Sequence, residues 1–131
     1  MKKKRFEIVS KVYTFLYYDG NWVLPIFETY SQGLGSPIAM SLYTLVNSQL
    51  ELYCVVTCNM PNSKRGAGCQ FIDVNNNNVS IVDWLMDNGF GDKTGNIATS
   101  GVCKYPEFNF YKGESFWMYR DVAKDIFNSH K

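Results

Sequence analysis

The stretch that decides the fold runs from Cys69 to Phe110 and reads CQFIDVNNNNVSIVDWLMDNGFGDKTGNIATSGVCKYPEFNF. Its first residues are apolar and favour a strand that ends at Ile72-Asp73-Val74. Four asparagines follow, Asn75 to Asn78, and asparagine side chains readily close turns and cap helices. The pattern therefore predicts a buried strand that ends in a turn.

A short amphipathic helix is predicted directly after the asparagines. An apolar period of 3.6 residues begins at Ile81, and Ser80 to Asp83 has a capping-box pattern that satisfies amides of the first turn. Asn88-Gly89 ends the helix, because both residues tolerate the left-handed conformation of a C-cap. With Trp84 or its neighbour Leu85 against the sheet, we expect one core to contain Phe71, Ile72, Val82, Trp84, Leu85, Phe108 and Phe110.

The segment from Gly89 to Ser100 contains several glycines and is interpreted as a loop, which leads to a second strand after Tyr105-Pro106. A loop this rich in glycine needs external anchors, and we expect the amides of Asn75 and Asn76 to supply them. The whole stretch is then a β-α-loop-β unit. The residues to which we assign this loop-structuring role are Asp73, Asn75, Asn76, Gly95 and Tyr105.

Several short motifs of this unit, in their order and spacing, resemble a small family of unknown function. They are Asp73-Val74-Asn75-Asn76, Asn88-Gly89-Phe90-Gly91, Thr94-Gly95, Ser100-Gly101 and Tyr105-Pro106-Glu107-Phe108-Asn109-Phe110, with Gly35-Ser36-Pro37-Ile38-Ala39 upstream. The chain resembles domain-of-unknown-function family 4313 from Tyr13 to Phe110, and departs from its pattern in the loop Asn62 to Gly68 and after Lys112. The resemblance implies a setting in gut-bacterial mobile elements and their phages, and it brings no catalytic role.

The flanking sequence predicts hairpins before the unit and a helix after it. Asp19-Gly20 is a strong turn signal, and Pro25 lacks a backbone donor, so its strand should be an edge strand or contain a bulge. An apolar stripe predicts a final helix from Glu114 to Asn128. We therefore predict one domain, residues 1–131, of the α+β class: a mostly antiparallel sheet of about five to seven strands with two helices packed on one face. The other predicted strands are 6–10, 12–18, 22–30, 40–46 and 50–57.

The formal net charge is +1, but the charges are unevenly placed. Lys2 to Arg5 and Lys11 crowd the start of the chain, while residues 12–63 contain no lysine or arginine. We interpret the basic run as a solvated terminus, with phosphate binding as the alternative. No apolar run approaches the ~20 residues that a spanning helix needs, so we expect a cytoplasmic protein with no membrane partner.

The sequence contains few residues in patterns typical of catalytic sites. The only histidine is His130, next to the last residue, which argues against a histidine-assisted nucleophile. Cys54 and Cys58 lie four residues apart on a predicted strand, too far apart to share a metal, and we expect all four cysteines to be reduced. We predict no catalytic residue, metal or cofactor. A carboxylate-metal hydrolase that uses Asp73, Asp92 and Glu107 stays open as an alternative.

These observations favour a non-catalytic binding or inhibitor protein of a phage or mobile element. Its expected partner is a host protein or ribonucleoprotein, such as a CRISPR or restriction defence component; its oligomeric state is left open. A second alternative is a small nucleic-acid-binding protein that contacts phosphates through Lys2 to Arg5 and Lys64-Arg65 and stacks exposed tyrosines on bases. The predicted partner-binding residues are Lys64 and Arg65 in an isolated basic loop, and Trp117 and Met118, which fall outside the apolar stripe of the final helix.

Overall fold

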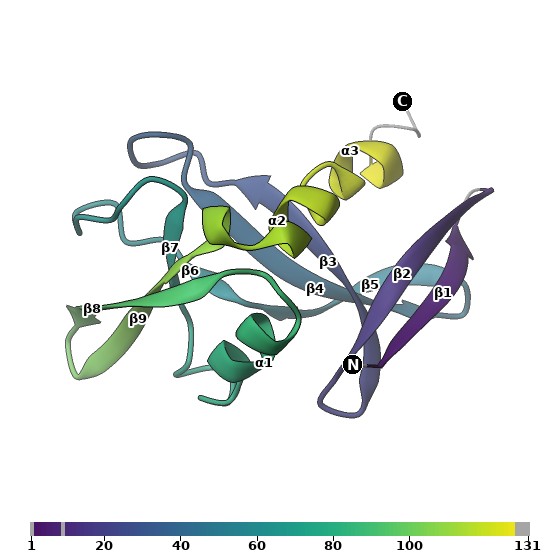
Figure 1. Ribbon diagram of the computed structural model, residues 1–131, viewed down its shortest axis with the longest axis horizontal. Coiled ribbons are helices and arrows are strands. Elements are labelled where there is room, and N and C mark those ends of the chain that lie inside the picture. The colour runs from purple at the N-terminus through teal and green to yellow at the C-terminus, as the bar shows by residue number, and fades with distance from the viewer. Residues whose placement is uncertain (1, 9, 128–131) are drawn as a thin grey trace.

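The computed structural model describes residues 2–8 and 10–127, which form two antiparallel sheets and short helices (Figure 1). The first sheet contains, in chain order, β1 (Lys3–Ile8), β2 (Lys11–Tyr18), β3 (Asn21–Thr29), β4 (Ile38–Val46) and β5 (Gln49–Val55). The second contains, in spatial order, β6 (Thr57–Cys58), β7 (Cys69–Ile72), β9 (Cys103–Asn109) and β8 (Asp92–Ser100). The helices are α1 (Ile81–Asp87), the 3₁₀-helix η1 (Phe110–Lys112), α2 (Glu114–Tyr119) and α3 (Val122–Phe127).

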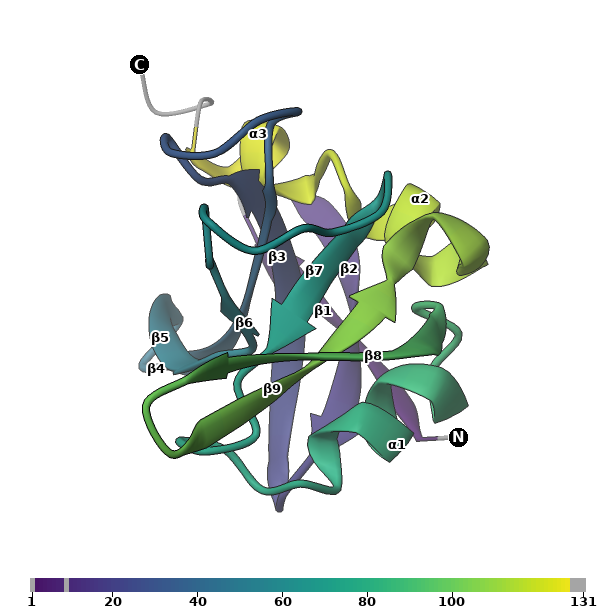
Figure 2. The same ribbon diagram turned by 90° about the vertical axis from the view of Figure 1, so that its left-hand side faces the viewer.

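The predicted α+β class and antiparallel pairing are confirmed, but the strands form two sheets in place of one. The predicted strand 50–57 is interrupted at Val56, which is fully buried. Its N–H donates to the Met40 carbonyl of the first sheet (2.9 Å), and its carbonyl accepts from the Asp73 N–H beside the second (2.9 Å). The chain changes sheets at this residue, and the second sheet crosses the first (Figure 2).

The prediction of a loop from Gly89 to Ser100 is wrong, because most of this segment is strand β8, paired with β9. The register shifts between Lys93 and Ile97. Gly95 lies in that irregular part with a φ of 92°, a conformation that glycine adopts without steric cost. Glycine here permits a β-bulge within a ladder.

Helix α1 ends as predicted but begins differently. Gly89 has a φ of 77°, its N–H donates to the Met86 carbonyl, and the Phe90 N–H donates to the Leu85 carbonyl. These two bonds form a Schellman motif. At the other end the predicted capping box is absent: Ser80 makes no side-chain cap. Its N–H instead donates to the Asn78 side chain (3.0 Å), because the asparagine turn already closes this end.

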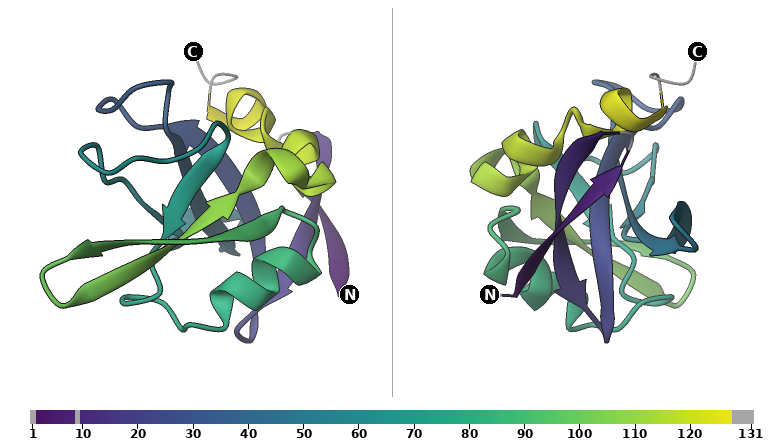
Figure 3. Two further views of the ribbon diagram at one scale, coloured as in Figure 1. Left: turned by 60° about the vertical axis from the view of Figure 1, so that its left-hand side comes forward. Right: turned by 90° about the vertical axis from the view of Figure 1, so that its right-hand side faces the viewer.

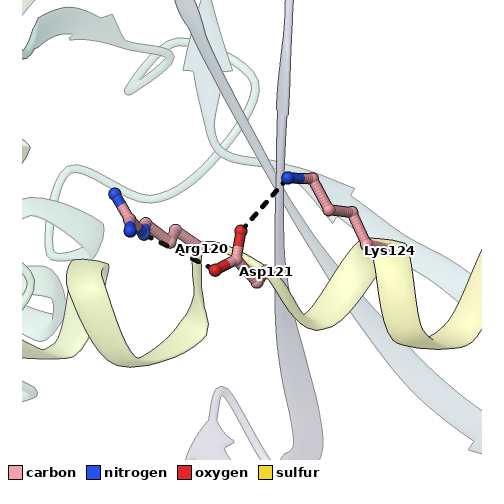
Figure 4. Close-up of polar contacts among 3 residues, drawn as sticks. All are labelled: Arg120, Asp121 and Lys124. Carbon is pink, nitrogen blue, oxygen red and sulfur yellow. Dashed lines mark ion pairs between the residues drawn. The ribbon is translucent and has the colours of Figure 1, made fainter.

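The predicted final helix is two short helices, α2 and α3, separated by a turn at Arg120-Asp121. The N–H groups of Lys124 and Asp125 donate to the Asp121 carbonyl, so a new helix starts there. The Asp121 carboxylate lies between Arg120 and Lys124, at 3.6 Å from each (Figure 4). These exposed ion pairs contribute little to stability.

The core lies between the two sheets and the helices. Among the predicted core residues, Ile72, Val82, Leu85, Phe108 and Phe110 belong to one buried cluster, as predicted. Trp84 is half-buried and packs against that cluster, and its indole N–H donates to the Tyr17 carbonyl (2.7 Å). Phe71 is buried but lies outside the cluster, because it points to the opposite side of its strand from Ile72.

The predicted edge position of the Pro25 strand is wrong, because β3 lies between β2 and β4 in the sheet. The proline nevertheless interrupts no hydrogen-bonded pairing with β2. Pairing of β2 with β3 stops at Leu16 and Val23. Had the register continued, Thr14 would face Pro25, which has no donor. The Thr14 carbonyl accepts instead from the Tyr119 hydroxyl of α2 (2.7 Å). Burial raises the pKa of Tyr119 to about 12, so this donor stays protonated at neutral pH.

No helix among the described residues is long and apolar enough to cross a membrane.

Candidate partner-binding surface

Two loops lie side by side at one end of the molecule, residues 31–37 after β3 and residues 59–68 before β7. We call them the paired loops. The Arg65 guanidinium donates to the Leu34 carbonyl, and the Asn59 amide donates to the Gln32 carbonyl (2.9 Å). Each loop therefore holds the other in place through side-chain to backbone bonds.

Buried polar groups attach the paired loops to the second sheet. Gln70, fully buried on β7, donates from its amide nitrogen to the Ile38 carbonyl (3.0 Å) and to the Asn59 side chain (3.2 Å). Glu107, which is 2% exposed on β9, accepts from the Gly66 N–H (3.0 Å). Such satisfied buried groups favour one loop conformation over the alternatives.

The Glu107 carboxylate also connects the paired loops to β8. It accepts from the Thr94 hydroxyl (2.6 Å) and the Asn96 amide (3.0 Å). Burial alone would raise the pKa of Glu107, but these bonds, the Gly66 N–H and the charge of Arg65 together lower the pKa below its ordinary value of 4.5. The carboxylate is therefore charged at neutral pH and binds three donors from two segments.

Replacing Glu107 with glutamine should lower the free energy of unfolding at neutral pH by about 1 to 3 kcal/mol, since an amide N–H would then face a donor. The pKa of Glu107 is lower in the folded state than in the unfolded state. The stabilisation of the folded protein by the charged Glu107 carboxylate is thus complete above pH 4.5, and it is lost as the pH falls through the pKa of Glu107 in the folded state.

Urea unfolding between neutral pH and pH ~3 would measure this difference. The gap between wild type and the Glu107→Gln variant should narrow on acidification. Glu28→Gln, a change at an exposed glutamate on β3, is the control and should stay within ~0.5 kcal/mol of wild type. A gap that stayed constant with pH would show that the carboxylate charge is not what stabilises the loops.

Between the paired loops lies a pocket of about 480 Å³, lined by Leu34, Lys64, Gly68 and Tyr111 among others. Leu34 is 89% exposed at its rim and Lys64 is also exposed. The Tyr111 ring lies directly against Gly68, where an added Cβ would come within 2.1 Å of the ring. Only glycine at this position lets the loop lie on the aromatic ring.

Tyr111 is also the first of three side chains that contact one another in turn. Its ring lies 5.0 Å from that of Trp117, whose indole N–H donates to the Tyr111 carbonyl (3.1 Å). The Arg120 guanidinium lies over the Trp117 ring at 4.9 Å. Tyr111 and Trp117 remain 49% and 43% exposed. We call the set Leu34, Lys64, Tyr111, Trp117 and Arg120 the Tyr111 surface.

The structure places three of the four predicted contact residues at or beside one pocket and separates Met118 from them. Lys64 and Arg65 line the pocket that Tyr111 also lines, and the Trp117 ring contacts the Tyr111 ring. Arg65 is half-buried, however, and joins the two loops. Met118, 73% exposed, lines a different pocket beside β1. Sequence reasoning missed Leu34, Tyr111 and Arg120; the spacing of Trp117 and Arg120, i and i+3 on a helix, was the available signal for the last.

The predicted loop-structuring residues hold a different segment from the one expected. The Asp73 carboxylate accepts from the Asn75 N–H (3.2 Å), the Asn76 N–H (3.1 Å) and the Asn76 amide (2.8 Å). The Asn75 amide donates to the Lys104 carbonyl on β9 (2.9 Å). The asparagines thus hold their own turn and β9 and not the segment 89–100, which needs no such anchor because β8 has its own ladder. Tyr105 is half-buried on β9, opposite Ala98.

The carboxylates of the hydrolase alternative have separate partners. Asp73 closes the asparagine turn, Asp92 accepts from the Lys93 N–H (3.0 Å), and Glu107 holds the paired loops. Among the described residues there is no group of three or more histidine, cysteine, aspartate or glutamate side chains that could hold a metal ion. His130 lies outside the described residues.

The four cysteines are free thiols. Burial, with the charge of Asp19 nearby, raises the pKa of Cys54 to about 11. Burial likewise raises the pKa of Cys58 and of Cys69. Thiols with a raised pKa are weakly nucleophilic at neutral pH, because the thiolate is the reactive form.

These observations define the class of the protein: an α+β fold of two antiparallel sheets that presents an exposed aromatic and cationic surface beside the paired loops. The chain belongs to the family described as Domain of unknown function (DUF4313), whose model matches residues 27–129. The match extends beyond Phe110 and includes the loop 62–68 and helices α2 and α3. No match was found among curated proteins, and none among solved structures.

Proposed function

We propose that this protein is a non-catalytic binding protein of a phage or mobile element, and that it attaches to a host macromolecule through the Tyr111 surface. The observation that carries the proposal is the exposed cluster of Tyr111, Trp117 and Arg120. Tyrosine, tryptophan and arginine are the residues that most often dominate binding energy at interfaces. Here all three lie together, beside a pocket with an exposed leucine and an exposed lysine at its edge.

The anchoring of this surface supports the same proposal. Trp117 is fixed by its bond to the Tyr111 carbonyl, and Tyr111 by its contact with Gly68. The loop that carries Lys64 is held through Arg65 and Glu107. A surface whose side chains are already ordered loses less conformational entropy on binding, which increases affinity.

The finer part of the proposal concerns the host target. A small binding protein without catalytic equipment acts by covering a surface that its partner needs. A mobile element benefits when its protein blocks a host defence component, such as a CRISPR or restriction complex. This part rests on the setting that the motif resemblance implies, together with the binding surface.

The experiment is a pull-down from a bacterial host lysate with the full chain as bait, with and without nuclease treatment. A Trp117→Ala, Arg120→Ala double variant should lose the captured protein, with a loss of affinity of about tenfold or more, because hot-spot truncations cost ~2 kcal/mol or more. Nuclease treatment should leave capture by the wild type unchanged.

Val102→Ala is the matched control, since Val102 is 98% exposed at the tip of the β8–β9 hairpin, away from α2 (Figure 3). It should capture the same protein as the wild type. Equal loss in both variants, or retention in both, would contradict the proposed surface. Loss of capture only after nuclease treatment would assign the contact to nucleic acid.

Lys64 and Arg65, which were predicted to act together, should behave differently. Lys64→Glu should weaken binding mostly through the association rate, and more at low salt than at high salt, as expected for a charge at an interface rim. Its melting temperature should not change. Arg65→Glu should lower the melting temperature as well, because it removes the bond to the Leu34 carbonyl. Identical melting temperatures for both variants would show that Arg65 does not hold the loops.

A further inference from the structure

The basic run at the start of the chain is part of the fold. Lys3 to Arg5 belong to β1, the edge strand of the first sheet, which pairs with β2 from Lys3 opposite Leu16 to Ile8 opposite Lys11. The run is exposed, as its interpretation as a solvated terminus expects, but three of its residues are paired in a strand. Lysines on an edge strand discourage strand pairing between molecules, but they also fix cations at regular intervals.

Alternation along the strand places these cations on both sides of the sheet edge. Lys2 and Lys4 lie on one side, where Lys2 is over the Tyr17 ring (4.6 Å) and Lys4 is over the Trp22 ring (5.9 Å). Tyr17 and Trp22 contact each other edge to face, 5.3 Å apart. This side combines two ammonium groups with two adjacent aromatic rings, and Tyr17 is 38% exposed.

On the other side Lys3 and Arg5 line a pocket of about 280 Å³, to which Lys4, between them in the sequence, also contributes. The rest of the lining includes Thr14, Ser115 and Met118, and no carboxylate lines the pocket among the described residues. The ion pairs of the described part of the chain involve Lys11, Arg120 and Lys124, and none involves residues 2–5. Four consecutive cations are thus left without a carboxylate partner in a chain of net charge +1.

We propose that the β1 edge binds single-stranded nucleic acid, with Lys2, Lys3, Lys4 and Arg5 on the phosphates and with Tyr17 and Trp22 as stacking platforms for bases. Residues two apart on a strand are ~6.6 Å apart, which suits successive phosphates of an extended strand. In the free protein the lysine ammonium groups cover the rings; on binding, bases take the rings and the ammonium groups move to the phosphates. The adjacent aromatic rings favour this ligand over an anionic membrane or an acidic peptide, neither of which offers bases to stack.

This site is separate from the Tyr111 surface. Trp117 and Arg120 do not line the pocket beside β1, although Ser115, Met118 and Tyr119 of helix α2 do. The two sites therefore use different side chains. A ribonucleoprotein would present ligands for both surfaces. The two proposals can fail independently, because one is tested with a protein partner and the other with a defined oligonucleotide.

The test is fluorescence anisotropy of a labelled oligo(dT) of about 16 nucleotides, with the full chain. Four phosphate contacts predict a slope of log affinity against log salt of about −3, so affinity should fall about fiftyfold between about 50 and 200 mM salt. The Lys3→Gln, Arg5→Gln variant should flatten that slope by about 1.4. Tyr17→Leu should lower affinity about fivefold or more without changing the slope. Tyr17→Phe, which keeps an aromatic ring, should retain the affinity of the wild type.

Lys93→Gln with Lys104→Gln, at exposed positions on β8 and β9, removes the same charge elsewhere and should leave the slope unchanged. An equal flattening of the salt slope in this control would overturn the site. The site would also be overturned if heparin bound as tightly as the oligonucleotide and Tyr17→Leu had no effect on affinity. Binding to phosphatidylglycerol vesicles without binding to the oligonucleotide would also overturn it. Unchanged melting temperatures in all variants would ensure that any loss is not due to unfolding.

Discussion

Replacing Leu85 with alanine should lower the free energy of unfolding by about 2 to 5 kcal/mol. Leu85 is fully buried on α1 and belongs to the core cluster between the sheets. Alanine removes three carbons and leaves a cavity that the surrounding residues can only partly fill. Its backbone carbonyl keeps the bond to the Phe90 N–H, so the loss is confined to side-chain packing.

Urea unfolding followed by circular dichroism would measure this change, and Val79→Ala is its matched control. Val79 precedes the same helix and is 71% exposed, so its truncation should cost no more than ~0.5 kcal/mol. The dependence of the free energy on urea should be the same in both variants. A cost for Leu85→Ala no larger than that of the control would remove Leu85, and with it α1, from the core.

Gly113→Ala should destabilise the protein by about 3 kcal/mol, the upper range for overpacking. Gly113 has an ordinary φ of −106°, so the cost is steric and not conformational. An added Cβ would lie 2.0 Å from the Phe90 carbonyl carbon and 2.3 Å from the Gly91 nitrogen. Both atoms are backbone and cannot move aside as a flexible side chain would.

The contact at Gly113 positions helix α2 on the end of α1. Next to it the Ser115 N–H donates to the Gly89 carbonyl (3.0 Å), and the Ser115 hydroxyl donates to the Asn88 carbonyl (2.6 Å). Separating the two segments would displace α2 and, with it, Trp117. The Gly113→Ala variant should therefore lose partner binding as well as stability.

Gly66→Ala is the matched control for this prediction. Its φ is also outside the positive range, and an added Cβ would meet only the Cys69 sulfur, at 3.2 Å. Thermal unfolding of the two variants side by side should show a large fall in melting temperature for Gly113→Ala and a small one for Gly66→Ala. Equal melting temperatures would mean that the α1–α2 contact is looser than described.

The sequence alone determined those parts of the fold for which neighbouring residues contain the whole signal. The end of α1 follows from one glycine with a positive φ, and the turn between β2 and β3 from Asp19 and Gly20, both with positive φ. The buried residues of α1 follow from their helical period. In each case the physical cause, a backbone conformation or a 3.6-residue period, acts within a few residues.

Strand β8 could not be found this way, because eight of its nine residues are exposed and it lacks the alternation of a half-buried strand. Its conformation depends on pairing with β9. The division into two sheets likewise depends on the two bonds of Val56, to Met40 and Asp73. These contacts join residues that are distant in the chain, and no local pattern encodes them.

In the candidate site, too, some features follow from local sequence and others depend on tertiary contacts. Lys64 and Trp117 could be selected from sequence, as an isolated charge in a loop and as an aromatic residue outside an apolar stripe. That they belong to one surface depends on Tyr111, which lies against Gly68 and contacts the Trp117 ring. Only tertiary structure decided this, because the packing of a ring against a glycine 43 positions earlier in the chain has no signature in either segment.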